Sequence, residues 1–386
     1  MADTRRVAIA LKINQPFPAN QEIYAGVQRF ARKHSHWKCV IHEQAVELAE
    51  RDPGSFDGII ARGGGGRRAS WQSDVPLVNT RYAAPGDRPD VSSVYIDTQQ
   101  CGELVAGHLI DRGFQRLAYM VDADLGQADA ICKAFADEAE ERGRSCSRGY
   151  IDTGAQGTHN YWLAARNGLE PFLRSLEPPV AILFAIPWMA RLAVTLSEDL
   201  GWRVPQDVAL ICLDNVTTIL EHAPEITSID LNYEQVGYEA AAMLERLMDG
   251  RQTEPRQIYV PPRGIIPRES TDHFASEDEA VAATLRFISE HLNQKLTVDR
   301  LADHVCVSPR SLQRRFEAAL SRPISDEIRR LRLEAAKRLL RDDRMQIGQI
   351  ARQVGFNSSV TINYVFHRET GMSPSAYRKR LKAERE

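Results

Sequence analysis

The sequence predicts a two-lobed α/β body followed by an all-α domain that carries two helix-turn-helix motifs. Three observations carry this prediction. Short apolar runs alternate with amphipathic helical segments from Arg6 to Ile266, which is typical of α/β folds. One pattern of apolar and small residues then occurs twice near the C-terminal end. The balance of charge also changes sign between the two parts.

The body is expected to contain parallel sheets joined by helices. Val7–Ile13 is a short apolar run, as in a buried parallel strand. In the helical segment 20–34 that follows, Ile23 and Val27 share one face. Further strands are expected at 38–42, 56–61, 76–80, 92–96, 116–121, 149–152, 180–186, 208–213, 228–231 and 257–266. Further helices are expected at 99–111, 128–142, 160–176, 188–200 and 233–249. Because this stretch exceeds one ordinary core, two lobes are predicted.

The all-α domain contains one pattern twice. Leu301 and Ala302 of the first copy correspond to Ile350 and Ala351 of the second, each 49 residues later. In each copy the small Ala lets two short helices cross closely, as a helix-turn-helix requires. The body is assigned to residues 1–272 and the all-α domain to 277–386, with motifs at 297–320 and 346–370 and a short polar join around 271–279.

Each motif is expected to present a polar helix face. Ser308 and Ser358 can cap the second helices by accepting a backbone N–H bond. An exposed Arg can bond guanine, and Gln can bond adenine. The candidate contact residues are Ser308, Arg310, Ser311, Gln313 and Arg314 in the first motif, and Ser358, Ser359, Thr361, Asn363 and Tyr364 in the second. The alternative is a plain helical bundle with charged outer faces, which a single motif does not exclude.

Charge and cysteine usage limit the classes of protein. The net charge is −3, yet residues 277–386 hold 21 Lys and Arg against 15 Asp and Glu. A basic tail on an acidic body indicates a nucleic-acid partner for the tail alone. The six cysteines are scattered without metal or redox spacing, so they indicate a reduced, cytoplasmic protein with no metal and no cofactor. The start of the chain shows no signal-peptide or membrane-span pattern.

The all-α domain resembles the AraC/XylS family of bacterial transcription regulators. The likeness rests on the long linking helix 325–340, on Gly355-Phe356, and on the segments 365–374 and 377–378. It implies binding to double-stranded operator DNA and contact with RNA polymerase. Tyr364 stands where many members have Arg.

The body resembles the periplasmic-binding-protein-like sensor of the LacI/GalR family. The matching segments are 56–60, 95–97, 107–109, 208–215, 226–229, 237–241, 260–263 and 266–270. The resemblance implies an α/β two-lobed periplasmic-binding-protein-like sensor, a small effector such as a sugar between the lobes, and a homodimer.

Polar and aromatic residues near the strand ends are the candidate ligand contacts. They are Asn14, Arg62, Asp97, Asp122, Trp188, Asp214 and Asn215. Adjacent carboxylate and amide groups, as in Asp214-Asn215, can pair with vicinal hydroxyls, and an indole such as Trp188 can face a sugar ring. The alternatives are that Asp214 caps a loop and that Trp188 only packs.

Two positions depart from the sugar-binding pattern of the family. Ile131 and Pro187 stand where an Arg and an Asp are usual. The cleft is therefore expected to bind a polyol differently, through Arg62 or His159, or to take a less polar ligand. The segment 62–68 resembles a phosphate loop, but it lacks the following Lys-Ser/Thr and is interpreted as a flexible turn.

Together these observations predict a ligand-responsive, DNA-binding activator rather than an enzyme. No arrangement of nucleophile, base and orienting acid stands out, so no catalytic residue is assigned. Asp97, Asp122 and Asp214 leave acid–base chemistry as one alternative. The alternative function is that of a sugar-binding or sugar-modifying α/β protein with a helical interaction module.

Overall fold

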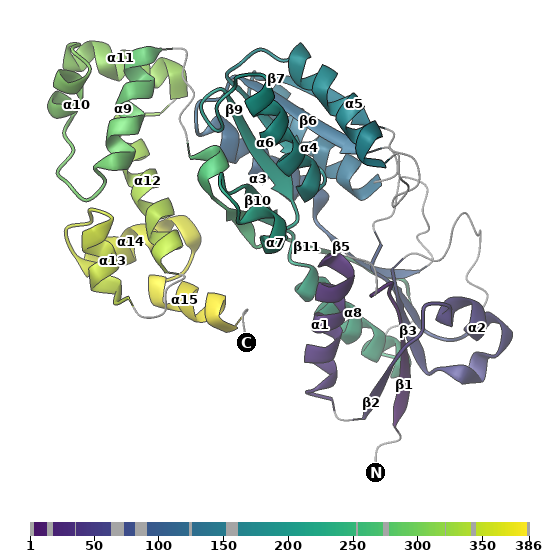
Figure 1. Ribbon diagram of the computed structural model, residues 1–386. Coiled ribbons are helices and arrows are strands. Elements are labelled where there is room, and N and C mark those ends of the chain that lie inside the picture. The colour runs from purple at the N-terminus through teal and green to yellow at the C-terminus, as the bar shows by residue number, and fades with distance from the viewer. Residues whose placement is uncertain are drawn as a thin grey trace. The chain divides into compact units, whose positions relative to one another are not determined.

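The computed structural model divides the chain into two compact units. The first comprises Met1–Ile110 with Phe114–His273, and the second Asp111–Gly113 with Phe274–Glu386. Figure 1 shows the sheets of the first unit and the helices of the second. The structure describes residues 4–13, 18–34, 36–62, 73–81, 91–122, 126–151, 161–251, 254–272, 278–320, 322–340 and 345–383.

The first sheet of the first unit is parallel throughout the described residues. Its strand order is β11-β5-β4-β3-β1-β2, and every neighbouring pair runs parallel. The strands are β1 (Arg5–Ala10), β2 (Trp37–Ile41), β3 (Gly58–Ala61), β4 (Leu77–Asn79), β5 (Ser92–Ile96) and β11 (Gln257–Val260). The central strands β3 and β5 are buried along their whole length, which explains the apolar run of β3, whereas β5 begins with the buried Ser92 and Ser93.

The second sheet has the order β12-β10-β9-β8-β6-β7. Its strands are β6 (Arg116–Asp122), β7 (Ser145–Ile151), β8 (Val180–Phe184), β9 (Val208–Leu213), β10 (Thr227–Asp230) and β12 (Gly264–Ile266). The pairs from β7 to β10 are parallel, but β12 runs antiparallel to β10. The predicted parallel sheets are confirmed for the other pairs, and β12 at this edge is the exception.

Helices connect the strands of the first unit. They are α1 (Pro18–Ala31), α2 (Ala45–Arg51), α3 (Thr98–Ile110), α4 (Gly126–Glu141), α5 (Tyr161–Ser175), α6 (Pro187–Asp199), α7 (Thr217–Leu220) and α8 (Tyr233–Met248), with short 3-10 turns at Pro53–Ser55 and Glu269–Thr271. Two glycines let α1 and α8 approach closely. A Cβ on Gly26 would lie 1.9 Å from the Glu234 carbonyl oxygen, and one on Gly237 would lie 2.0 Å from that of Ile23.

The predicted strand 257–266 is divided between the two sheets. β11 joins the first sheet and β12 the second, with Pro261 and Pro262 between them. Proline lacks the N–H that a continuing ladder needs. The chain therefore leaves one lobe and enters the other at this point.

The chain crosses between the two lobes three times, near Asp97, at residues 230–232 and at residues 260–263. Hydrogen bonds join these three crossing segments to one another. The Asp97 N–H donates to the Val260 carbonyl at 2.8 Å. The Asn232 side-chain amide donates to the Pro261 carbonyl at 3.0 Å, and the Arg263 N–H donates to the Asp230 carbonyl at 2.9 Å. Asn232 adopts a left-handed backbone conformation with φ 62°, which Asn tolerates better than most residues. These bonds join the crossings into one hinge.

The second unit consists of helices α9 (Glu279–Glu290), α10 (Val298–His304), α11 (Pro309–Leu320), α12 (Ile324–Leu339), α13 (Ile347–Gln353), α14 (Ser359–Thr370) and α15 (Pro374–Ala383). Two apolar clusters form its core, one around Phe316 and one around Phe366. Leu292 packs against both clusters. Each cluster therefore supports one predicted motif, and the long helix α12 connects them.

No helix in the described part of the chain is long and apolar enough to cross a membrane.

Candidate nucleic-acid interface and sensor cleft

The first helix-turn-helix is built from α10 and α11. Thr297 caps α10, because its hydroxyl accepts from the Arg300 N–H at 3.3 Å. Cys306 makes the turn with φ 53°. The Ser308 hydroxyl then accepts from the Ser311 N–H at 3.3 Å. The predicted cap at Ser308 is confirmed, so this side chain helps to begin α11.

The outer face of α11 carries unpaired polar side chains. Leu312 and Phe316 are fully buried, while Arg310, Gln313 and Arg314 are exposed. None of these three has a hydrogen bond or ion pair to a described residue. Ser311 is half-buried on the same helix. The first recognition face is therefore open for contact with a ligand of opposite charge.

The second helix-turn-helix is built from α13 and α14. The Gln349 side chain accepts from the Gln346 N–H at 3.0 Å and so closes the first turn of α13. Gly355 makes the turn with φ +83°. The Ser358 hydroxyl accepts from the Thr361 N–H at 3.2 Å, which confirms the second predicted cap. Gly371 ends α14 in a left-handed conformation, as is common at helix C-termini.

The outer face of α14 is less charged than that of α11. Ser359, Thr361, Asn363 and Tyr364 are exposed. The Thr361 hydroxyl lies 3.0 Å from the Ser358 hydroxyl. Tyr364 interacts with Arg368. Val360, which was not among the predicted contact residues, is 75% exposed and Tyr364 is 67% exposed.

In the first unit, Arg62 and Asp214 face the hinge from different lobes. Arg62 follows β3 and Asp214 follows β9. The Arg62 guanidinium lies 5.0 Å from the ring centre of Tyr233, and Tyr233 hydrogen-bonds Asp214. Asp214 adopts a left-handed conformation with φ 63°. One oxygen of Asp214 (Oδ1) and one nitrogen of Arg62 (Nη1) are buried and have no hydrogen-bond partner among the described residues.

Burial raises the pKa of several ionisable groups around the hinge. The pKa of Asp214 is raised to about 6 by burial, against the opposing effects of Arg62 and Tyr233. The pKa of Glu22 on α1 is raised to about 7, first by burial and then by repulsion from Asp230 and Asp214. The pKa of Tyr233 is also raised, first by burial and then by Asp214. Asp214 and Arg62 were predicted from strand ends, whereas Glu22 and Tyr233 lie on helices and were missed.

Glu22 makes the stability of the effector-free protein depend on pH, and this dependence can be measured. Its ordinary pKa is 4.5 and its folded pKa about 7, so between these values the folded state holds a proton that the unfolded chain releases. Stability therefore falls as pH rises through this window. Glu22→Gln is expected to stabilise the free protein at pH 7.5 by on the order of 2 kcal/mol, and to lose this advantage below about pH 4.5. Thermal unfolding across pH checks it, with the exposed Glu43→Gln as control. An unchanged pH profile in Glu22→Gln would contradict the assignment.

The other predicted ligand residues occupy more varied positions. Asp97 caps α3, since its Oδ1 accepts from the Gln100 N–H at 2.9 Å. It lies close enough to Cys101 to raise the pKa of that thiol, as Asp214 also does, although burial is the main cause. The Asn215 side-chain oxygen accepts from the Arg268 guanidinium at 2.7 Å and from the Ser228 hydroxyl at 3.0 Å. The oxygen of Asn215 is therefore already used within the protein.

Asp122 and Trp188 lie near the same sheet edge as Asp214. Asp122 is the last residue of β6, and Trp188 lies in the first turn of α6, which follows β8. The strands β6 and β8 are parallel neighbours, and β8 pairs with β9 in turn. Asp122 is 4% exposed. The Trp188 ring lies 4.5 Å from that of Trp162, centre to centre, and Trp188 is half-buried.

Two predicted ligand positions, Asn14 and His159, and most of the glycine-rich segment 62–68, lie outside the described residues. Ile131 and Pro187, the two departures from the family pattern, are both buried. Ile131 is only 1% exposed, so its side chain belongs to the core of the second lobe.

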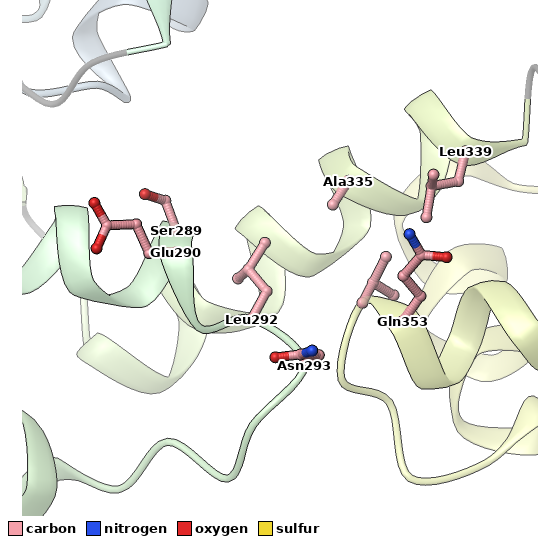
Figure 2. A pocket seen from close by; sticks show the side chains of 8 residues that line it. Ser289, Glu290, Leu292, Asn293, Ala335, Leu339 and Gln353 are labelled. Carbon is pink, nitrogen blue, oxygen red and sulfur yellow. The ribbon is translucent and has the colours of Figure 1, made fainter.

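A pocket of about 350 Å³ lies in the second unit, between α9, α12 and α13. Figure 2 shows Leu292, Ala335 and Leu339 beside the polar side chains that complete it. These leucines belong to the apolar cluster around Phe366. The pocket is therefore part of the junction between the two motifs.

Comparison with known proteins supports the same two-part division. A family model described as a periplasmic binding protein-like domain matches residues 106–271, and one described as a helix-turn-helix domain matches residues 301–380. The chain is 27% identical over 388 residues to the xylose operon regulatory protein of Escherichia coli K12, covering 97% of each protein. It is 34% identical over 102 residues to the arabinose operon regulatory protein of the same organism, covering 26% of this chain and 35% of that one.

The solved structure of the xylose-binding transcription activator XylR resembles the whole chain. It matches with a TM-score of 0.61 at 25% identity and covers 98% of each chain. These relatives are transcription regulators and not enzymes. The predicted fold class, an α/β two-lobed sensor followed by an all-α domain with two helix-turn-helix motifs, is confirmed. The chain is thus a DNA-binding transcription regulator that combines a periplasmic binding protein-like domain with a helix-turn-helix domain of the AraC type.

Proposed function

We propose that this regulator activates genes of carbohydrate use, and that a small polyhydroxylated effector bound at the hinge controls it. The regulator then binds specific double-stranded operator DNA through the exposed faces of α11 and α14. Arg310, Gln313 and Arg314 on α11 contact base edges in the part of the operator that α11 enters. The serines Ser308 and Ser358 begin the two helices, whose first turns enter the major groove.

The observation that carries the effector proposal is a pair of buried polar atoms at the hinge that lack a hydrogen-bond partner among the described residues. The buried Asp214 Oδ1 accepts and the buried Arg62 Nη1 donates, and neither has a partner among the described residues. Leaving such groups unpaired costs about 1–3 kcal/mol each. A ligand with neighbouring hydroxyls can donate to the carboxylate and accept from the guanidinium, so binding recovers this free energy.

The geometry favours a sugar over an apolar ligand. The indole of the half-buried Trp188 can cover the apolar face of a sugar ring while the charged groups hold its hydroxyls. Because relatives of this chain are named for xylose, a pentose such as xylose is the first compound to test. Asp97 and Asp122 complete the proposed polar lining, with the side-chain amide of Asn215 donating from the second lobe.

The effector is expected to stabilise the protein by an amount that its affinity sets. At a concentration of one hundred times its dissociation constant, it adds about 2.7 kcal/mol. A thermal-shift series with xylose, other pentoses, hexoses and polyols measures this. Asp214→Asn is expected to abolish the shift, and the exposed Asp74→Asn to leave it unchanged. A shift of equal size in Asp214→Asn, or no shift with any polyhydroxylated compound, would contradict the proposed site.

The family resemblance supports three further parts of the proposal. The protein acts in the cytoplasm, forms a homodimer through its sensor, and contacts RNA polymerase when bound upstream of a promoter. A dimer presents four helix-turn-helix motifs, which explains how one regulator can occupy two neighbouring half-sites.

A further inference from the structure

The second recognition helix carries exposed apolar side chains at the positions where the first carries arginines. Leu312 and Phe316 in the core of α11 correspond to Ile362 and Phe366 in α14, each 50 residues later. The same offset relates Arg310 to Val360, Gln313 to Asn363, and Arg314 to Tyr364. The two faces therefore have matching geometry but different chemistry.

Val360 and Tyr364 form one apolar patch on α14. They are four residues apart, so they are neighbours on the helix surface. Val360 is 75% exposed and Tyr364 is 67% exposed. Isolated exposed apolar residues are common on proteins. This pair differs because it lies on the face that we propose enters the major groove, next to the exposed Asn363.

The patch matches the chemistry of an A·T base pair. Thymine alone places a methyl group in the major groove, and apolar side chains contact it, whereas Asn can bond adenine through two hydrogen bonds. Guanine has no methyl group there and is bonded by Arg or Lys. Residues 359–366 contain neither Arg nor Lys, and Arg368, one turn further along α14, pairs with Glu369.

We propose that α14 reads thymine methyl groups through Val360 and Tyr364, with Asn363 on an adjacent adenine. Each half-site then contains a guanine-bearing block for α11 and a thymine-bearing block for α14. This inference rests on the proposed function, because it requires that both helices enter the major groove. It assigns opposite base preferences to two motifs of the same fold.

The test uses the full chain and a duplex selected from a random pool. Each thymine of the selected site is replaced by deoxyuridine, which removes only the methyl group. Replacement is expected to matter at one or two positions, all in the block that α14 contacts. Each such replacement is expected to weaken binding roughly fourfold, the effect of losing one buried methyl group. Val360→Ala is expected to remove the penalty at its own position. Arg314→Ala is expected to keep it, and to lose instead the penalty for replacing guanine by 7-deazaguanine in the other block.

A second variant keeps the result interpretable. Tyr364→Arg recreates the chemistry of Arg314 and is expected to shift the selected base at its position from thymine towards guanine. A selected site whose deoxyuridine profile is flat, or a profile that Val360→Ala and Tyr364→Ala leave unchanged, would overturn the thymine assignment. In that case the guanine block still demonstrates specific DNA binding. Failure to select any sequence would overturn the proposed function together with this inference.

Discussion

Replacing Gly355 by alanine is expected to remove specific DNA binding while the sensor keeps its affinity for the effector. Gly355 has φ +83°, and a Cβ there would lie 1.8 Å from the Leu292 carbonyl oxygen and 2.8 Å from the Arg332 guanidinium. Arg332 also donates to the Leu292 carbonyl at 3.1 Å. The substitution therefore adds backbone strain to a steric overlap and breaks this contact. A cost of roughly 3 kcal/mol or more is expected.

The position of Leu292 extends the effect to both motifs. Leu292 packs against the clusters of the first and of the second motif, so displacing it disturbs the angle between α11 and α14. Calorimetric unfolding and DNA-binding titrations measure the loss. Gly348→Ala is the matched control, because a Cβ there meets nothing within 4 Å and alanine favours the helix by up to about 1 kcal/mol. Similar stability and DNA affinity in the two variants would show that this account of the turn is wrong.

Arg314→Ala is expected to cost about 1–3 kcal/mol on the selected site and to relax the preference at one base pair. Arg314 is exposed and unpaired among the described residues, so its removal leaves the folded protein intact. Lys337, on α12, instead pairs with Glu334 at 2.9 Å. Lys337→Ala is expected at most to weaken all sequences alike, as for a phosphate contact.

Titrations of each variant against the selected duplex and a random duplex separate these roles. A specific contact lowers the ratio of the two affinities, whereas a phosphate contact preserves it. An equal loss on both duplexes for Arg314→Ala would place Arg314 among the phosphate contacts. The guanine assignment for α11 would then fail.

The structure of the second unit was predictable because the interactions that define its helices join residues close together in the sequence. The predicted Ser308 and Ser358 caps follow from residues within one helical turn of each other. The structure confirms them. Val360 was not among the predicted contact residues, yet it is 75% exposed on α14.

The hinge was less predictable because it is assembled from distant segments. Tyr233 and Glu22 reach the site of Asp214 from α8 and α1, and no pattern within either helix indicates this. Asn215 was predicted from its neighbour Asp214, yet its oxygen is bonded to Arg268 and Ser228. The segment 257–266 was likewise not predictable from local sequence. Its two prolines do not reveal that the strands on either side belong to different sheets.

The effector at the hinge is expected to control the DNA-binding unit, and a thermodynamic cycle on the full chain tests this claim most directly. The affinity for the selected duplex is measured with and without saturating effector, and the affinity for the effector with and without saturating duplex. Coupling between two sites is reciprocal, so both ratios are expected to be equal and to lie in the range of about 5–150-fold. Asp214→Ala is expected to keep the effector-free DNA affinity and to reduce both ratios to one. A wild-type protein that binds both partners with ratios of one would contradict the claim.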